Sequence, residues 1–217
     1  MKIGILGTGT VARTIGARLI ALGHEVKIGS RKLGNENASA FVERAGRAAS
    51  AGTFADAAAF GEIVFLAVAG NAALDVVGGE VGANLVGKIL IDVTNPLDFS
   101  HGMPPVLIPA LSNTTSLGEE LQKALPRTRV VKSLNTMNAD VMVDPGLIEG
   151  RHDVFVCGED AGAKAEVVRL LQSFGWHNAI DLGGISAARG TEAVLPLWLR
   201  LWGALGHPRF NFHVAGA

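Results

Sequence analysis

A glycine-rich turn joins an apolar strand to a helix at the start of this chain. The strand pattern of residues 2–6 runs directly into Gly7-Thr8-Gly9-Thr10-Val11-Ala12. Gly7 allows a tight turn off the strand, Gly9 lets the backbone approach a pyrophosphate without an intervening Cβ, and Ala12 keeps the helix close to the sheet. This order of elements favours a βαβ arrangement and predicts a dinucleotide-binding turn.

The helix after the turn completes the predicted phosphate site. It begins near Thr10, and its unsatisfied N–H groups and positive dipole end face the phosphates, where the hydroxyls of Thr8 and Thr10 add donors. Apolar residues recur along it at helical spacing, at Val11, Ile15, Leu19 and Leu22. The alternative is a tight strand-to-helix turn without a ligand, but the flanking strand and helix favour binding.

The end of the second predicted strand indicates which dinucleotide is bound. An NAD-preferring site usually has an acidic residue there to bind the ribose hydroxyls, whereas this chain has Ser30, Arg31 and Lys32. The nearest acid, Glu25, begins the strand, about 16 Å from its other end. One hydroxyl and two cations suit a 2′-phosphate, so the sequence favours NADP over NAD. A solvated basic turn is the alternative.

Strand-like and helical patterns alternate along the chain, which predicts an α/β fold with a doubly wound, Rossmann-type parallel sheet. The predicted strands are Ile3–Leu6, Val26–Ile28, Ile63–Val68, Ile89–Val93, Val130–Ser133, Val154–Cys157 and Ala179–Leu182. After the helix that begins near Thr10, the predicted helices are Ala38–Arg47, Phe54–Phe60, Ala72–Val81, Ser116–Ala124, Ala161–Phe174 and Ile185–Leu205.

The 217 residues, 48% of them hydrophobic, are enough for one well-buried unit. We expect a single Rossmann-type unit over residues 1–217, with a dinucleotide-binding core at 1–135. Residues 136–217 would form a short C-terminal α/β extension that ends in a long apolar helix and completes the acceptor pocket. Prolines deny regular structure to Asn95–Thr115, and this long loop is expected to contribute to the substrate pocket or to serve as a connection.

Composition argues against several other classes of protein. A net charge of −1 without a basic stripe argues against nucleic-acid binding. The single cysteine, Cys157, excludes an internal disulfide and is expected to be buried. The histidines show no metal-ligand spacing, so no metal site is predicted. The chain shows neither an export signal nor a membrane-spanning pattern, which predicts a cytoplasmic protein.

A few polar residues near the predicted strand ends could contribute to an acceptor site. His101 in the long loop could donate to a bound acceptor, and solvation is its alternative. Asn135 could hold a carboxamide or phosphate, or cap a loop. Asp92 is expected to cap backbone donors, and Lys132 could face the site or pair with Asp92.

The last predicted helix is apolar on nearly every side except at Arg200. Trp198 and Trp202 lie four residues apart among several leucines, a pattern that indicates burial on more than one face. One face should pack on the sheet. The other is expected to contact a second copy in a homodimer, or to form the wall of the acceptor pocket.

Four segments, taken in order, resemble the coenzyme F420-dependent NADP oxidoreductases. They are Gly7–Ala12, Gly23–Arg31, Ile91–Leu97 and Val130–Thr136. The similarity extends over essentially the whole chain, including a final helix that carries Arg189 and Glu192. The resemblance implies hydride transfer between C4 of the nicotinamide of NADP and C5 of a deazaflavin, chemistry that needs little acid or base assistance. The chain has no tyrosine, which excludes the Tyr/Lys dyad of short-chain dehydrogenases.

The resemblance also implies a set of cofactor-binding residues. Thr8–Ala12 would hold the pyrophosphate, and Ser30, Arg31 and Lys32 the 2′-phosphate. Ala67 and Val68 would lie on the nucleoside side, and Asn95 and Pro96 near the nicotinamide.

The sequence leaves two alternatives to a deazaflavin (F420) acceptor. One is NADPH-dependent reduction of a flavin, a metal complex or an imine, the activities of the same superfamily. The other is a non-catalytic protein that senses NADP(H).

Overall fold

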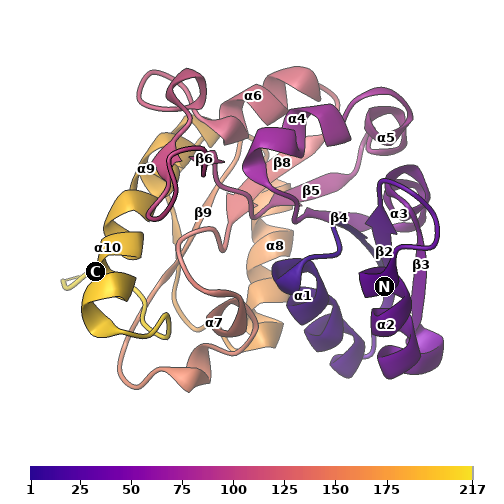
Figure 1. Cartoon of the computed structure of the whole chain (residues 1–217), viewed down its shortest axis with the longest axis horizontal. Coiled ribbons are helices and arrows are strands. Elements are labelled where there is room, and N and C mark those ends of the chain that lie inside the picture. Colours follow the sequence, from indigo (N-terminus) through magenta and orange to yellow (C-terminus); the bar gives the residue numbers. More distant parts are fainter. Residues whose placement is uncertain (217) are drawn as a thin grey trace.

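Eight strands form one sheet in the order β10-β9-β8-β5-β4-β1-β2-β3 in the computed structural model, which describes residues 1–216 (Figure 1). The strands are β1 (Lys2–Leu6), β2 (Glu25–Ser30), β3 (Ala49–Thr53), β4 (Ile63–Leu66), β5 (Ile89–Asp92), β8 (Arg129–Ser133), β9 (Val154–Cys157) and β10 (Ala179–Asp181). The six strands from β3 to β8 pair in parallel, so their carboxyl ends share one edge of the sheet. This confirms the prediction of a doubly wound sheet.

The last two strands differ from the prediction of a parallel sheet throughout. β9 pairs antiparallel with β8, and β10 pairs parallel with β9. The β8–β9 ladder joins only Lys132 to Cys157 and Ser133 to Val156. An apolar run such as Val154–Cys157 has the same character in either direction, so the sequence pattern could not reveal its orientation.

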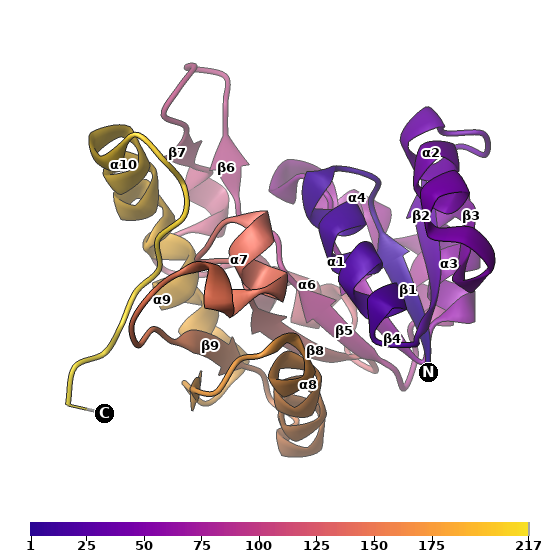
Figure 2. The same ribbon diagram turned by 90° about the horizontal axis from the view of Figure 1, so that it is seen from below.

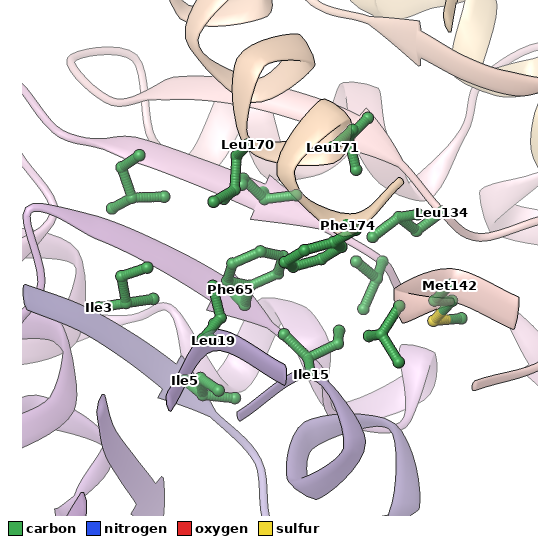
Figure 3. Packing of buried hydrophobic residues seen from close by; sticks show 14 of the residues in the cluster. Ile3, Ile5, Ile15, Leu19, Phe65, Leu134, Met142, Leu170, Leu171 and Phe174 are labelled. Carbon is green, nitrogen blue, oxygen red and sulfur yellow. The ribbon is translucent and has the colours of Figure 1, made fainter. Parts of the chain in front are cut away.

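Helices cover both faces of the sheet (Figures 1 and 2). They are α1 (Thr10–Ala21), α2 (Glu36–Ala45), α3 (Phe54–Phe60), α4 (Ala73–Val76), α5 (Gly79–Asn84), α6 (Leu117–Ala124), α7 (Ala139–Val143), α8 (Ala161–Phe174), α9 (Ala188–Ala193) and α10 (Leu195–Leu205). Apolar side chains of α1, α2, α7 and α8 form one core with the sheet, and those of α3 to α6 form the other. Figure 3 shows Ile15 and Leu19 of α1 and Phe174 of α8 meeting Phe65 of β4 in the first core.

Side-chain caps set several helix starts. Asn35 caps α2, Thr53 and Asp56 form a capping box at α3, and Asp160 caps α8, each by accepting a hydrogen bond from a backbone N–H of the first turn. Gly175, at a φ of 108°, ends α8 in the left-handed conformation that glycine adopts without strain.

Two predicted helices are divided in the structure, and the loop predicted to lack regular structure contains some. The predicted helix over Ile185–Leu205 is a 3₁₀ turn (Ile185–Ala187), then α9 and α10, and Pro196 at the start of α10 cannot donate the helical hydrogen bond that would join them. The helix predicted over Ala72–Val81 is divided at Gly78 between α4 and α5. Within the long loop, β6 (Leu97–Asp98) and β7 (Val106–Leu107) form a hairpin, and Pro109–Leu111 form a 3₁₀ turn.

Two elements were missed by the sequence patterns. β3 consists of alanine, serine, glycine and threonine, which give no apolar run, and it pairs on one side only, with β2. α7 is a helix of five residues capped by Asn138. Among residues 1–216 no helix has the length and apolar character needed to cross a bilayer.

Candidate functional site

The glycine turn after β1 lies between the ends of β2 and β4. Gly7 adopts a φ of 133°, and a Cβ added there would lie 2.2 Å from the carbonyl oxygen of Ala67. The Gly7 N–H donates to the carbonyl of Gly29 at 3.0 Å. Only glycine therefore fits this position. The cause is the close approach of the ends of β1, β2 and β4 and does not depend on a bound ligand.

The second glycine of the turn has a different environment. Gly9 is the N-cap of α1, no side chain caps the helix, and a Cβ at Gly9 would meet nothing within 4 Å. Arg13 donates to the carbonyl of Thr8 at 3.2 Å, which braces the turn from the helix side. An open approach to uncapped N–H groups at the helix start fits a phosphate group.

A cavity of about 390 Å³ lies beyond the carboxyl ends of β2 and β3. Ser30 and Arg31 line it, and the Ser30 hydroxyl donates to the carbonyl of Lys32 at 2.5 Å. Arg31 and Lys32 are exposed. One cation, Arg31, therefore lines the cavity, and a second, Lys32, is the next residue along the chain. Asp75 of α4 and Glu80 of α5 also line this cavity, and sequence reasoning missed both because they follow β2 by more than forty residues.

The loops after β4 and β5 meet at the next part of the carboxyl edge. Ala67 and Val68 are partly buried at the end of β4. A Cβ at Gly70 would lie 1.9 Å from the carbonyl oxygen of Asn95, so the two loops touch through their backbones. Pro96 is buried beside them.

Asn95 and Asn135 bind each other across the ends of β5 and β8. The Asn95 side chain donates to the Asn135 carbonyl at 2.8 Å, and the Asn135 side-chain NH₂ donates to Asn95 Oδ1 at 2.9 Å and to the Thr191 carbonyl at 3.1 Å. Both Asn135 side-chain hydrogens are therefore used within the protein. The residue before it, Leu134, has a φ of 63°, a conformation that costs a non-glycine residue about 1–3 kcal/mol. The structure thus places Asn135 as a link between loops.

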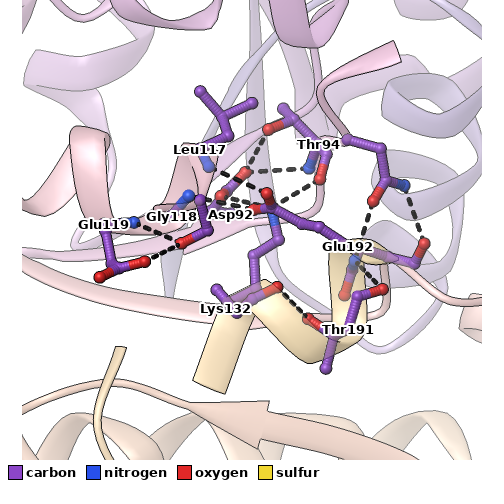
Figure 4. A network of polar contacts seen from close by, with 12 residues as sticks. Asp92, Thr94, Leu117, Gly118, Glu119, Lys132, Thr191 and Glu192 are labelled. Carbon is purple, nitrogen blue, oxygen red and sulfur yellow. Dashed lines mark hydrogen bonds and ion pairs between the residues drawn. The ribbon is translucent and has the colours of Figure 1, made fainter. Parts of the chain in front are cut away.

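A buried cluster of charged groups lies under these loops (Figure 4). Lys132 Nζ donates to Asp92 Oδ2 at 2.8 Å and to the Thr94 carbonyl at 2.7 Å, and it lies 2.7 Å from Glu192 Oε1. Asp92 Oδ1 accepts from the backbone N–H of Thr94 at 2.9 Å and from its hydroxyl at 2.6 Å. The prediction that Asp92 caps backbone donors is confirmed, and of the two alternatives for Lys132, the structure has the pair with Asp92.

The cluster continues into the start of α6. Glu192 accepts from the N–H groups of Leu117 at 2.9 Å and Gly118 at 3.0 Å, so the helix start carries part of the charge balance. Burial would lower the pKa of Lys132, but Asp92 and Glu192 outweigh it and raise that pKa, so the lysine stays protonated. Burial raises the pKa of Glu192, and Lys132 opposes this shift.

The structure places His101 apart from this group, at the exposed tip of the β6–β7 hairpin. There it helps to lower the pKa of Asp98, a shift caused mainly by the hydrogen bond from the Ser100 N–H.

Figure 2 shows the hairpin beside α10. A groove of about 560 Å³ lies between the two and is lined by apolar side chains, among them Met103 and Trp202, and by Arg200. No three His, Cys, Asp or Glu side chains within residues 1–216 are grouped as metal ligands.

The strand order, the uncapped helix start after β1 and the loops at one edge define a protein with a Rossmann-type, dinucleotide-binding fold. A family model described as "NADP oxidoreductase coenzyme F420-dependent" matches residues 2–96. The F420-dependent NADP reductase of Methanothermobacter marburgensis is 30% identical over 210 residues, which cover 93% of this chain and 92% of the relative. The chain belongs to this family of F420-dependent NADP oxidoreductases.

Two further comparisons extend this placement. The metalloreductase STEAP3 of Rattus norvegicus is 31% identical over 91% of this chain, and the chain spans only 38% of that protein's length. A crystal structure of a protein assigned as an F420-dependent NADP reductase from Arthrobacter sp. FB24 is 51% identical, with a TM-score of 0.94 and 99% of both chains covered.

Proposed function

We propose that this protein transfers hydride between NADP(H) and a deazaflavin. The observation that carries the proposal is similarity to F420-dependent NADP reductases over nearly the full length of both chains. The match to each of these relatives covers 93% of this chain, so it extends beyond the dinucleotide-binding core at 1–135 into the C-terminal extension.

Bound NADPH supplies the hydride, and the protein's own residues hold and orient its ends. The N–H groups at the start of α1 would bind the pyrophosphate from the open side of Gly9, with Gly7, Thr8 and Thr10–Ala12 shaping the turn. Ser30, Arg31 and Lys32 would bind the 2′-phosphate in the cavity beyond β2. Ala67 and Val68 would lie on the nucleoside side, and Asn95 and Pro96 would border the nicotinamide.

The buried charges support a reaction without acid or base catalysis. All three N–H bonds of the Lys132 ammonium have acceptors, and the oxygens of Asp92 and Glu192 already accept hydrogen bonds. These groups are therefore committed to one another rather than to a substrate proton. Hydride transfer between two flat rings needs alignment and exclusion of water instead.

The test is consumption of NADPH with four additions: a deazaflavin, riboflavin phosphate, a ferric chelate, and buffer alone. We expect turnover with the deazaflavin at least ten times faster than with the other acceptors. Equal or faster turnover with riboflavin phosphate or the ferric chelate would replace the proposal by a flavin or metal reductase, the class suggested by the similarity to metalloreductase STEAP3. Tight NADP binding without turnover of any acceptor would indicate an NADP(H) sensor.

We propose further that the outer face of α10 contacts a second copy of this chain. Leu197 and Leu205 of α10 are 52% and 51% exposed, and Met103 on the neighbouring hairpin is 67% exposed. Apolar side chains gathered in this way indicate a contact surface. Light scattering during size-exclusion chromatography should give a dimer for the natural chain and a monomer for Leu197→Glu. A monomer in both would leave the apolar face to the acceptor pocket.

A further inference from the structure

Lys132 holds a backbone carbonyl at the candidate nicotinamide end of the site as well as two carboxylates. Its ammonium lies 2.7 Å from the Thr94 oxygen, and the Thr94 N–H and hydroxyl are both held by Asp92. Thr94 is thus bound at three atoms by two buried charged side chains. Such a residue has little freedom to rotate about its backbone bonds.

The direction of the Thr94 carbonyl sets the direction of the next N–H. The peptide bond between Thr94 and Asn95 is planar and trans, so its N–H points away from its carbonyl. The carbonyl points into the protein toward Lys132, and the Asn95 N–H therefore points outward. Asn95 is partly exposed, and its N–H donates to no group within residues 1–216.

The same ammonium ties the C-terminal extension to this peptide. Glu192 belongs to α9, and its carboxylate lies against Lys132 and the start of α6. A Cβ at Gly118 would lie 2.9 Å from the Ala188 Cβ, so glycine allows α9 to approach α6 closely enough for this contact. Figure 4 shows Glu192 reaching from α9 to Lys132.

We propose that Asp92, Lys132 and Glu192 act together as positioning residues for hydride transfer. They aim the Asn95 N–H at the carboxamide oxygen of the nicotinamide, and they couple the placement of α9 to the orientation of the ring. This inference rests on the proposed function. The three side chains touch neither substrate, and their effect passes through the Thr94–Asn95 peptide.

Glu192→Gln tests the proposal with little risk to folding, because the Lys132 ammonium keeps its ion pair with Asp92 and no buried charge is left without a partner. Its matched control is Glu119→Gln. Glu119 of α6 accepts two hydrogen bonds from Arg189 of α9, at 2.6 and 2.8 Å, and this ion pair also joins the two helices. Glu119 has no contact with Lys132. A general loosening of α9 would therefore affect both variants, whereas a loss of positioning would affect Glu192→Gln alone.

We expect Glu192→Gln to slow single-turnover hydride transfer about 10- to 100-fold, the size of effect that a misplacement of about 1 Å produces. The Kd for NADP should change less than about 2-fold, because the phosphates supply most of the affinity. The primary isotope effect with NADPH deuterated at C4 should rise. Glu119→Gln should match the natural protein in rate and isotope effect. Equal rates in the two variants would overturn the proposal.

A second pair of variants tests the same peptide from the other side. Thr94→Val removes the hydrogen bond from the hydroxyl to Asp92 and should slow hydride transfer. Thr94→Ser keeps that hydrogen bond and should transfer hydride at the rate of the natural protein. No difference between the two would count against the positioning role.

Should the natural protein transfer no hydride to any acceptor, the proposed function fails, and NMR of bound NADP⁺ decides the positioning role. A shift of the nicotinamide H4 resonance in Glu192→Gln but not in Glu119→Gln would support it. Identical spectra would overturn it.

Discussion

Replacing Arg31 by alanine is the sharpest test of the 2′-phosphate site. Arg31 lines the cavity beyond β2 and is exposed to solvent, so its attraction to a phosphate acts at a dielectric close to that of water. Two unit charges 4 Å apart then attract by about 1 kcal/mol. A phosphate monoester carries about −1.5 to −2 charges near pH 7. The loss for NADP should be about 1.5–2 kcal/mol, or roughly 10- to 30-fold in Kd.

The measurement is the Kd of NADP and of NAD by isothermal titration, at low and at high salt. NAD lacks the phosphate, so its Kd should change less than about 2-fold. The difference between the nucleotides should shrink at 1 M salt, where the Debye length is about 3 Å. Glu80→Gln removes an acid from the same cavity and should tighten NADP binding by removing a repulsion.

The control is Arg47→Ala, because Arg47 is exposed in the 3₁₀ turn at the amino end of β3, whereas the cavity lies beyond the carboxyl end of that strand. It should leave both affinities unchanged. Equal losses for NADP and NAD in Arg31→Ala, or a loss as large in Arg47→Ala, would refute the assignment of Arg31 to the phosphate.

The remaining predictions concern stability and reactivity. Gly7→Ala should lower the free energy of unfolding by about 3 kcal/mol or more in urea titrations, through backbone overlap with Ala67 and a φ of 133°, whereas Gly9→Ala should change it by less than about 1 kcal/mol yet weaken NADP binding. Burial raises the pKa of the Cys157 thiol to about 12, so iodoacetamide at pH 8 should label it only after unfolding. Burial alone would raise the pKa of Asp153, but hydrogen bonds from Val214, Asn178 and His213 outweigh it and hold that pKa below 3.8. The stability that Asp153 contributes should therefore be present at neutral pH and be lost as pH falls below about 4, and unfolding curves of Asp153→Asn should lack this part of the pH dependence.

Local patterns predicted most of the fold. The strand from Lys2, the glycine turn and α1 are contiguous in sequence, and their geometry follows from residues that are close along the chain. β3 could not be predicted from an Ala-Ser-Ala-Gly-Thr segment, since its place depends on pairing with β2. The division of the last helix at Pro196 could have been predicted, because proline cannot donate the hydrogen bond that continues a helix.

The site divides in the same way. The turn at Gly7–Ala12 and the residues after β2 are local features. The contact of Lys132 with Glu192 and the placement of Asp75 and Glu80 beside Arg31 arise only when distant segments fold together. Asp92 and Lys132 are an intermediate case, because they occupy paired positions on neighbouring parallel strands. Each lies at the end of an apolar strand, so the sequence suggested that they could pair. It could not show that the two strands are neighbours in the sheet.

The ladder between β8 and β9 has two residue pairs, whereas β1 and β2 share five. A seam this short offers little resistance to twisting, so other contacts must keep the extension from pivoting on the core. Lys132 is itself one of the two rungs. Local opening of the sheet should therefore begin at this ladder, and deuterium uptake at the Cys157 amide, on the side of β9 that faces β8, would report it.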